Sequence, residues 1–379
     1  MKLTTAGESH GKALVAIIEG LPAHLAVDLQ QINDELALRQ KGYGRGGRQK
    51  IERDQVEILT GVRNKQTLGS PVTLCIYNKD YQNWAQAMSA ENCDEEKMQA
   101  KALTKVRPGH ADLTGIIKYE QNDARNVLER ASARETAIRV AAGSVFKQFL
   151  SVLGVEIAGY VTEICGVKDA GMYAFNDLLR AKDTQTGMLD AQSETLAMQT
   201  IDTLKKQGDT AGGTVEVRVR GLKRGFGSVM TYDEKLDACL AKELMSIQAV
   251  KGVEIGAGFD VAHVSGKYVH DEIYRDESKG YFHATNRAGG IEGGMSNGEE
   301  IVVRVAMKPI PTLMRGLNTV DVATGEKAVA ASERSDVCAI FALERIAEAA
   351  VARVIAQAVQ VRLGGDTMEQ VQLRYEQLP

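Results

Sequence analysis

The sequence lacks the features that would assign it to several specialised classes of protein. No apolar run reaches the roughly 18 residues that span a bilayer, and the first residues contain no apolar segment typical of a secretory signal. The five cysteines are scattered and none forms a C-x-x-C pair, which argues against a disulfide framework or a thiolate metal site. No two histidines stand at the spacing of metal ligands. We therefore expect a cytoplasmic protein with no metal and no membrane partner.

Charge is nearly balanced over the whole chain but concentrated in one stretch. The net charge of −4 gives no global attraction to nucleic acid. Residues 39–53 nevertheless carry one acidic residue and six basic ones, which are Arg39, Lys41, Arg45, Arg48, Lys50 and Arg53. Such a patch favours a site for a small anion, with a solvated basic loop as the alternative. A module that binds RNA would interleave aromatic residues here, and only Tyr43 does so. We expect no nucleic-acid partner.

Two short segments each place a histidine beside glycine in a stretch that favours loops. They are GESHG at residues 7–11 and RPGHAD at residues 107–112. Histidine changes its charge near neutral pH, so His10 and His110 are candidates for proton transfer. A lone histidine in a loop is more often structural. Ser9 leaves a serine nucleophile open as a further alternative, although the chain contains no G-x-S-x-G elbow.

Arginines stand among small residues in two other candidate anion sites. The segment GYGRGG at residues 42–47 matches G-x-G-x-x-G, but it follows a helical pattern instead of a strand, which excludes the dinucleotide fingerprint. A basic loop that folds over a phosphate fits better. The run RASAR at residues 130–134 precedes a helical pattern, where free N–H groups favour an anion and Ser132 could also act as the helix cap.

Hydrophobic periodicity predicts strands and helices that alternate along the chain. The expected strands are 13–19, 56–60, 72–77, 155–164, 214–219 and 301–307. The expected helices are 28–41, 132–153, 193–207, 231–247 and 339–363, two of them opened by capping boxes at Ser132 and Thr231. Strand 214–219 alternates buried valines with charged residues, which is typical of an antiparallel sheet. Segments 167–192 and 266–287 read as long loops. The pattern indicates one large α/β or α+β domain.

Taken together, these motifs resemble the chorismate synthase family. GESHG, RPGHAD, the run RASARET at residues 130–136, GGIEGG at residues 289–294 and the triplet RSD at residues 334–336 occur in the family's order. Each motif is weak alone, whereas five in sequence are specific. The segments QAVKG at 248–252 and KPIPT at 308–312 resemble the form found in Gram-positive bacteria.

The resemblance implies a lyase of the shikimate pathway. The family eliminates phosphate and a ring proton from 5-enolpyruvylshikimate 3-phosphate in an anti-1,4 sense and gives chorismate. It requires reduced FMN although the reaction involves no net redox change. The implied fold is α+β, a single-domain β-α-β sandwich over residues 1–379 with helices between two antiparallel sheets and active-site loops at about 39–54, 88–112, 266–300 and 308–336. The implied assembly is a homotetramer.

The resemblance also assigns roles to residues. His10 would be the acid for the departing phosphate, His110 would protonate the flavin near N1, and Asp336 would be the base working through flavin N5. The substrate's phosphate and carboxylates would meet Ser9, Arg45, Arg48, Arg107, Arg134 and Arg334. The cofactor would contact Arg39, Arg45, Arg130, Ala131, Ser132, Gln248, Ala249, Gly293, Lys308, Pro309, Ile310, Pro311, Thr312 and Arg334.

NADPH is a candidate reductant, because Arg39 and Arg45 match positions that the family associates with it. The chain departs from the family at Ala131, where serine is frequent, and at Arg345, which we expect to alter packing near the flavin. An NADPH- or flavin-dependent oxidoreductase that acts on a phosphorylated anion is the alternative function.

Overall fold

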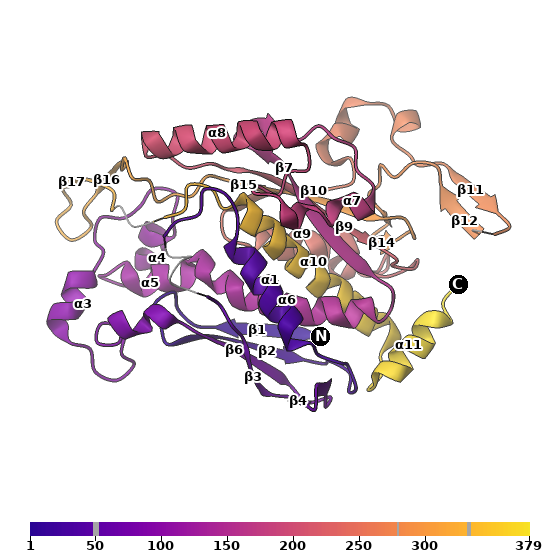
Figure 1. Ribbon diagram of the computed structural model, residues 1–379, viewed down its shortest axis with the longest axis horizontal. Coiled ribbons are helices and arrows are strands. Elements are labelled where there is room, and N and C mark those ends of the chain that lie inside the picture. The colour runs from indigo at the N-terminus through magenta and orange to yellow at the C-terminus, as the bar shows by residue number, and fades with distance from the viewer. Residues whose placement is uncertain (48–52, 279, 332–334) are drawn as a thin grey trace.

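The protein was analysed as a computed structural model that describes residues 1–47, 53–278, 280–331 and 335–379. Two antiparallel sheets organise the chain (Figure 1). The smaller sheet has the order β1-β2-β6-β3, with strands Lys2–Ala6, Ala13–Glu19, Val72–Tyr77 and Glu57–Thr60. The larger sheet has the order β10-β15-β9-β7-β8, with strands Val250–Ile255, Ile301–Met307, Gly213–Arg220, Glu156–Ile164 and Val167–Lys168.

Three helices connect the two sheets. Helix α6 (Thr136–Ser151) packs on β2 and β6, and helix α10 (Ile340–Leu363) packs on β7, β9 and β15. The two helices pack against each other, and α1 (Leu29–Gln40) contacts both. Figure 1 shows all three between the sheets. Among the described residues, the other α-helices are α3 (Glu95–Lys101), α4 (Asp112–Lys118), α5 (Arg125–Ala131), α7 (Phe175–Leu178), α8 (Ala191–Gln207), α9 (Leu236–Met245) and α11 (Met368–Glu376).

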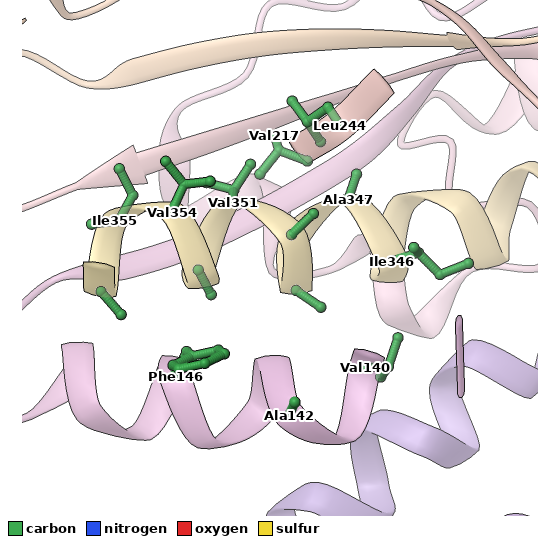
Figure 2. Packing of buried hydrophobic residues seen from close by; sticks show 14 of the residues in the cluster. Val140, Ala142, Phe146, Val217, Leu244, Ile346, Ala347, Val351, Val354 and Ile355 are labelled. Carbon is green, nitrogen blue, oxygen red and sulfur yellow. The ribbon is translucent and has the colours of Figure 1, made fainter. Parts of the chain in front are cut away.

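One apolar cluster runs through the contact between α6 and α10. Phe146 of α6 faces α10, while Val217 of β9 and Leu244 of α9 lie on the opposite side of α10 (Figure 2). All three side chains are fully buried. A Cβ on Gly143 of α6 would lie 2.2 Å from the Cβ of Ala349 of α10, so these small residues let the helices approach closely. Burial of this apolar surface is the main force that joins the two sheets.

Short antiparallel hairpins extend from this frame. They are β4–β5 (Val62–Arg63 and Gln66–Thr67), β11–β12 (Ile273–Asp276 and Gly280–His283), β13–β14 (Ile291–Glu292 and Met295–Ser296) and β16–β17 (Asn318–Val320 and Lys327–Val329). Short segments of 3-10 helix lie at η1 (Lys79–Asn83), η2 (Ala133–Glu135), η3 (Ala181–Asp183), η4 (Tyr232–Glu234), η5 (Gly258–His263) and η6 (Gly266–Tyr268). The β11–β12 hairpin projects from the body (Figure 1).

Most of the predicted elements are confirmed. The mixed α+β class with antiparallel sheets is correct, and strands 13–19, 72–77 and 301–307 have the predicted bounds. Helix α1 begins after Asp28, whose carboxylate accepts hydrogen bonds from two backbone N–H groups. Helix α8 ends at Gly208, which has a φ of 69°. In β9, the three predicted valines are buried and the charged residues between them are partly exposed.

Both predicted capping boxes are wrong, because tertiary contacts replace them. Ser132 caps only η2, and the helix begins at Thr136 because the Glu135 carboxylate turns away to accept hydrogen bonds from Thr5 Oγ1 and Gln248 Nε2. Thr231 makes no side-chain cap. Helix α9 begins five residues later at Leu236, whose N–H donates to the carbonyl of Gly294 in the β13–β14 turn.

Two further predictions also need correction. Segment 266–287 is not an irregular loop, since it forms the β11–β12 hairpin, and segment 167–192 contains β8, α7 and the start of α8. The predicted loops 88–112, 266–300 and 308–336 likewise contain α3, two hairpins and β16–β17.

We expect truncation of Phe146 to alanine to lower the free energy of unfolding by about 3–5 kcal/mol, since the side chain is fully buried between α6 and α10. Urea unfolding followed by circular dichroism measures the change. Leu29→Ala is the control, because Leu29 is 44% exposed on α1, and it should change stability by about 0.5 kcal/mol or less. Equal losses in the two variants would contradict this description of the core.

Candidate active site

A cavity of about 450 Å³ opens where the ends of several elements meet. The Gly42–Gly47 loop, residues 9–10, residues 107–111, the α5–α6 junction, residues 247–249 and 307–312, and the start of α10 all contribute to it. Its volume is that of a small-molecule site. Part of the lining is apolar, including Leu128, Ile247, Met307, Ala342, Leu343 and Ile346. Both predicted histidines, His10 and His110, line this one cavity.

His10 is held by a buried carboxylate and an aromatic ring. Its Nδ1 lies 2.8 Å from Glu129 Oε1, and its backbone N–H donates to Glu129 Oε2 at 2.7 Å. The imidazole stacks on Trp84 with ring centroids 4.0 Å apart. Burial alone would raise the pKa of Glu129, but the hydrogen bond and charge of His10, together with Arg125, lower the pKa below its ordinary value.

His110 has a parallel arrangement on a different segment. Its Nδ1 lies 2.5 Å from Asp112 Oδ1, and Arg107 Nε donates to the other carboxylate oxygen at 2.8 Å. Burial would raise the pKa of Asp112, but hydrogen bonds from His110 and Arg107 hold it well below its usual range. Arg107 also donates to Thr312 Oγ1. Asp112 is the first residue of α4 and is completely buried.

These contacts fix the tautomer of both rings. An ionised carboxylate only accepts hydrogen bonds, so the nitrogen that faces it must carry a proton. Nδ1–H is therefore the donor in His10 and in His110, although Arg107 Nη2 also lies 3.1 Å from His110 Nδ1. This leaves Nε2 of each ring as the nitrogen that a ligand in the cavity can engage.

The basic loop reaches the cavity through Arg45 and Gly46. Arg45 Nη1 lies 3.3 Å from Asp336 Oδ2, and the Gly46 N–H donates to Asp336 Oδ1 at 2.6 Å. The loop is docked by Gly44, whose carbonyl accepts from the N–H of Val337. Gly44 has a φ of 85°, and a Cβ there would lie 2.9 Å from Ile201, so the close approach requires glycine. Arg45 Nε is buried and has no hydrogen-bond partner among the described residues.

Two more arginines line the cavity from the α1 and α6 sides. Arg39 donates to Thr136 Oγ1 and to the Ala133 carbonyl. Burial and the neighbouring Arg134 and Arg45 lower the pKa of Arg39 to about 9, against the opposing effect of Asp54, so it stays charged at neutral pH. Arg134 donates to Asp54 Oδ2 at 2.7 Å and to Asn78 Oδ1. Asp54 therefore lies between two cations. The described lining of the cavity carries more basic than acidic side chains, with four arginines and Lys308 against Asp336.

The serine and glutamine side chains of the site come from separate segments. Ser132 Oγ lies 3.3 Å from Ser9 Oγ, and both line the cavity with Ala131. Gln248 donates to Glu135, while its buried Oε1 has no partner among the described residues. Ala249 has a φ of 67°, a conformation that costs a residue with a side chain about 1–3 kcal/mol. This turn is stabilised where the Ala249 carbonyl accepts from Lys308 N–H at 3.0 Å.

The structure brings most of the predicted site residues together but not all of them. Lys308, Ile310, Pro311, Thr312 and Asp336 line the cavity. Three others do not, namely Arg130, Gly293 and Pro309. Arg130 instead donates to Thr5 and to the Gly7 carbonyl, and Gly293 lies in the β13–β14 turn. Arg48 and Arg334 lie outside the described residues.

Arg345, which we expected to alter packing near the flavin, does not line this cavity. It pairs with Glu344 and Glu348 on the opposite side of α10, where Glu348 also pairs with Lys147. Lys147 Nζ in turn lies 3.0 Å from Glu35 Oε1 of α1. These charges border a second cavity of about 350 Å³. Their opposite signs compensate one another within the core.

Sequence reasoning missed two residues that contact His10. Glu129 is separated from His10 by 119 positions, and Trp84 lies in the segment after η1. The available signals were the position of Glu129 directly before the RASAR run and the fact that the chain has a single tryptophan.

Within residues 1–47, 53–278, 280–331 and 335–379, no group of three or more His, Cys, Asp or Glu residues is arranged to hold a metal ion. Nor does any helix in those ranges have the length and apolar character needed to cross a membrane.

Comparisons with known proteins extend over almost the whole chain. The family model for chorismate synthase matches residues 1–360. A chorismate synthase of Caldicellulosiruptor bescii is 51% identical over 371 residues, which cover 97% of this chain and 96% of the relative. One from Geobacter metallireducens is 51% identical over 386 residues, covering 99% and 98%. A crystal structure of chorismate synthase superimposes with a TM-score of 0.79 at 41% identity and covers 99% of this chain and 96% of the other.

The lowered pKa of Asp112 predicts a pH-dependent contribution to stability. A carboxyl group with a depressed pKa stabilises the folded state above its unfolded pKa, which is about 3.9, and the contribution is lost as the pH falls through the folded value. We therefore expect Asp112→Asn to lower the free energy of unfolding most near pH 7 and progressively less below about pH 4. Urea unfolding across this range measures the difference.

The exposed Asp366 supplies the control for that experiment. Asp366→Asn should leave both stability and its pH dependence close to those of the wild type. A stability loss in Asp112→Asn that is constant from pH 7 to pH 3 would exclude the ion-pair explanation.

Proposed function

This chain belongs to the chorismate synthase family, and from that premise we propose how its cavity carries out the family's reaction. The enzyme is a carbon–oxygen lyase that converts 5-enolpyruvylshikimate 3-phosphate to chorismate and phosphate. One C–O bond and one ring C–H bond break, and a new C=C bond forms, so the reaction has no net redox change. The protein must therefore bind a polyanion, supply a proton to the leaving group and remove one from carbon.

We propose that reduced FMN binds in the cavity beside the substrate. The fit is supported by the apolar lining, which suits an aromatic ring system, and by the buried Gln248 Oε1, which has no partner among the described residues. Ala131, Ser132, Gln248, Ala249 and the segment 308–312 are the proposed contacts. When bound, the reduced flavin supplies electron density that assists departure of the phosphate and is recovered as the proton leaves.

We assign the proton transfers to three side chains. His10 holds a proton on Nε2 that it donates to the departing phosphate, while Glu129 stabilises the charge of the ring. His110 holds a second proton at its own Nε2, with Asp112 in the corresponding supporting position. Asp336 is the carboxylate that receives the proton lost from the substrate, and Arg45 and the Gly46 N–H hold it in place.

The substrate's three acidic groups meet a cluster of fixed cations. Arg45 is the foremost candidate, because its buried Nε has no partner among the described residues. Arg107 and Arg134 have several donors engaged with Asp112, Asp54 and Asn78, so they contribute as oriented positive charges. Ser9 completes the binding side near His10. We include Arg48 and Arg334 in this set on the resemblance alone.

The observation that supports this proposal most strongly is the convergence of both carboxylate-bound histidines on one cavity lined by four arginines. NADPH enters the proposal only as a reductant of the flavin, because the elimination consumes no electrons. Arg39, which the resemblance links to NADPH, is 6% exposed and has its donors occupied by Thr136 and Ala133.

We further propose a single-domain β-α-β sandwich that assembles as a homotetramer. The continuous apolar cluster from Leu14 to Tyr375 supports one domain. Self-association is supported by the projecting segment 256–287, which exposes the apolar side chains of Phe259, Val261, Val264, Tyr268, Ile273, Tyr274 and Tyr281. Exposed apolar side chains gathered on one such segment are typical of a surface that binds another chain.

We expect His10→Ala and His110→Ala each to reduce turnover by about a hundredfold or more, because each removes a positioned proton donor. The assay is anaerobic, with 5-enolpyruvylshikimate 3-phosphate and chemically reduced FMN, and phosphate release is measured. Circular dichroism and unfolding midpoints verify that the variants are folded.

His263→Ala is the matched control, since His263 is exposed in η5 and does not line the cavity. Wild-type rates in either cavity variant would remove the assigned role. No phosphate release by FMN-loaded wild-type protein would defeat the function, and stoichiometric NADPH consumption per product would favour an oxidoreductase.

Substitution of Arg45 by methionine should weaken substrate binding by roughly 10- to 100-fold, the range expected for loss of a charge-assisted hydrogen bond. The measurement is KM under the same anaerobic conditions. Arg63→Met removes an exposed arginine on β4 and should leave KM unchanged. An unchanged KM in Arg45→Met would place anion recognition elsewhere.

A further inference from the structure

The surroundings of His10 form a closed set of contacts that the reaction described above does not by itself require. Glu129 binds His10 with both carboxylate oxygens, one at the ring and one at the backbone N–H. The Glu129 carbonyl accepts in addition from the Ser9 N–H at 3.0 Å. Glu129 is 2% exposed and lies on α5. This one residue therefore fixes both the loop that carries His10 and the orientation of its ring.

Trp84 holds the same imidazole from its face. The two rings are inclined by only 24°, which makes the contact a stack. Trp84 is itself anchored where its Nε1–H donates to Asp80 Oδ2 at 3.2 Å. Lys101 Nζ and Arg125 Cζ lie 4.4 and 5.1 Å from the Trp84 ring centre. Arg125 also donates to Glu129 Oε1 at 3.3 Å, so the carboxylate and the indole share one cation.

On this geometry, and resting on the proposed function, we propose that Glu129 and Trp84 are positioning residues for His10. Glu129 keeps a proton on Nδ1 and Trp84 sets the ring plane, so that the second proton of the imidazolium lies on Nε2 and faces the leaving phosphate. Neither residue lines the cavity. Both therefore act through His10.

Replacing Glu129 by glutamine tests the tautomer directly. Oε1 accepts from His10 Nδ1–H and Arg125, and Oε2 accepts from the His10 backbone N–H. Glutamine keeps the shape but has only one oxygen, so one of these donors must face its NH2 group. The His10 backbone N–H and the ring Nδ1–H then compete for the one remaining oxygen. The side chain at position 129 therefore no longer requires a proton on Nδ1 of His10.

The single tryptophan of the chain makes the state of His10 observable. Fluorescence excited near the red edge of the indole band comes from Trp84 alone. Because Trp84 stacks on His10, gain of a proton by the ring should change this emission, and the titration reports His10 without substrate or flavin. Asp80, Lys101, Arg125 and Glu129 are the charged groups in contact with this pair of rings.

The experiment compares Glu129→Gln with the wild type in two independent measurements on the full-length chain. We expect kcat to fall by roughly 10- to 1000-fold with KM changed less than about threefold, since a wrong tautomer affects proton transfer and leaves the anion site intact. We also expect the pH midpoint of the Trp84 emission to move lower, because the charged form of the ring loses its carboxylate partner. His10→Asn should abolish the transition.

Glu243→Gln is the matched control. Glu243 is a partly buried carboxylate that bridges Arg139 and Arg353 away from the cavity, and its pKa is also lowered, although burial opposes this effect of the two arginines. This variant should lose stability without changing kcat or the fluorescence midpoint. Trp84→Phe, which retains a stacking ring, should keep most of the activity that Trp84→Leu loses.

A Glu129→Gln enzyme with wild-type kcat, or one whose fluorescence midpoint equals that of the wild type, would overturn the proposal. The same holds if Trp84→Phe and Trp84→Leu are equally active. A wild-type protein without lyase activity would defeat the proposed function separately, because the fluorescence titration still reports whether Glu129 controls His10.

Discussion

The site depends on the confinement of several positive charges beside one cavity. Arg39, Arg45, Arg107 and Arg134 repel one another, and burial removes much of the solvation that each would have in water. The chain compensates with carboxylates placed behind or between them. Asp54 serves Arg39 and Arg134, Asp112 serves Arg107, and Asp336 serves Arg45. The remaining positive charge borders the cavity, where, in the function proposed above, a substrate with one phosphate and two carboxylates completes the compensation.

Each of the two histidines belongs to the same kind of unit. In both, a buried carboxylate receives the imidazole Nδ1–H and an arginine donor, and the ring offers its other nitrogen to the cavity. The two units come from different parts of the chain. Asp112 is two positions from its histidine and Glu129 is 119 positions away. The pattern therefore arises from separate segments of the chain and not from a repeated motif.

The sequence predicted what local pattern controls. The alternation in β9, the bounds of β2 and the start of α1 at Asp28 were predicted correctly because local pattern and capping there depend on neighbours in sequence. Predictions from local pattern were wrong where contacts with residues distant in the sequence determine the structure. The Glu135 carboxylate accepts hydrogen bonds from Thr5 and Gln248 and does not form the predicted capping box with Ser132. Sequence reasoning missed Glu129 and Trp84 for the same reason, since their contacts with His10 join segments that are far apart in the sequence. The motifs indicated which residues lie together at the site, and the fold was needed to show which side chains hold them in position.

The charged residues on the far side of α10 have a consequence for the cavity. The pairs of Arg345 with Glu344 and Glu348 lie within α10, whereas Glu348 meets Lys147 of α6 only when α10 sits at its observed rotation. A slide of one residue or a partial roll would separate the opposite charges of Glu348 and Lys147 in the interior, which costs more than a shift among apolar neighbours. The charge pair on one side of α10 therefore also fixes the position of Ala342, Leu343 and Ile346, the apolar residues that line the cavity. This wall of the cavity can therefore keep its position on α10 while substrate binds and product leaves.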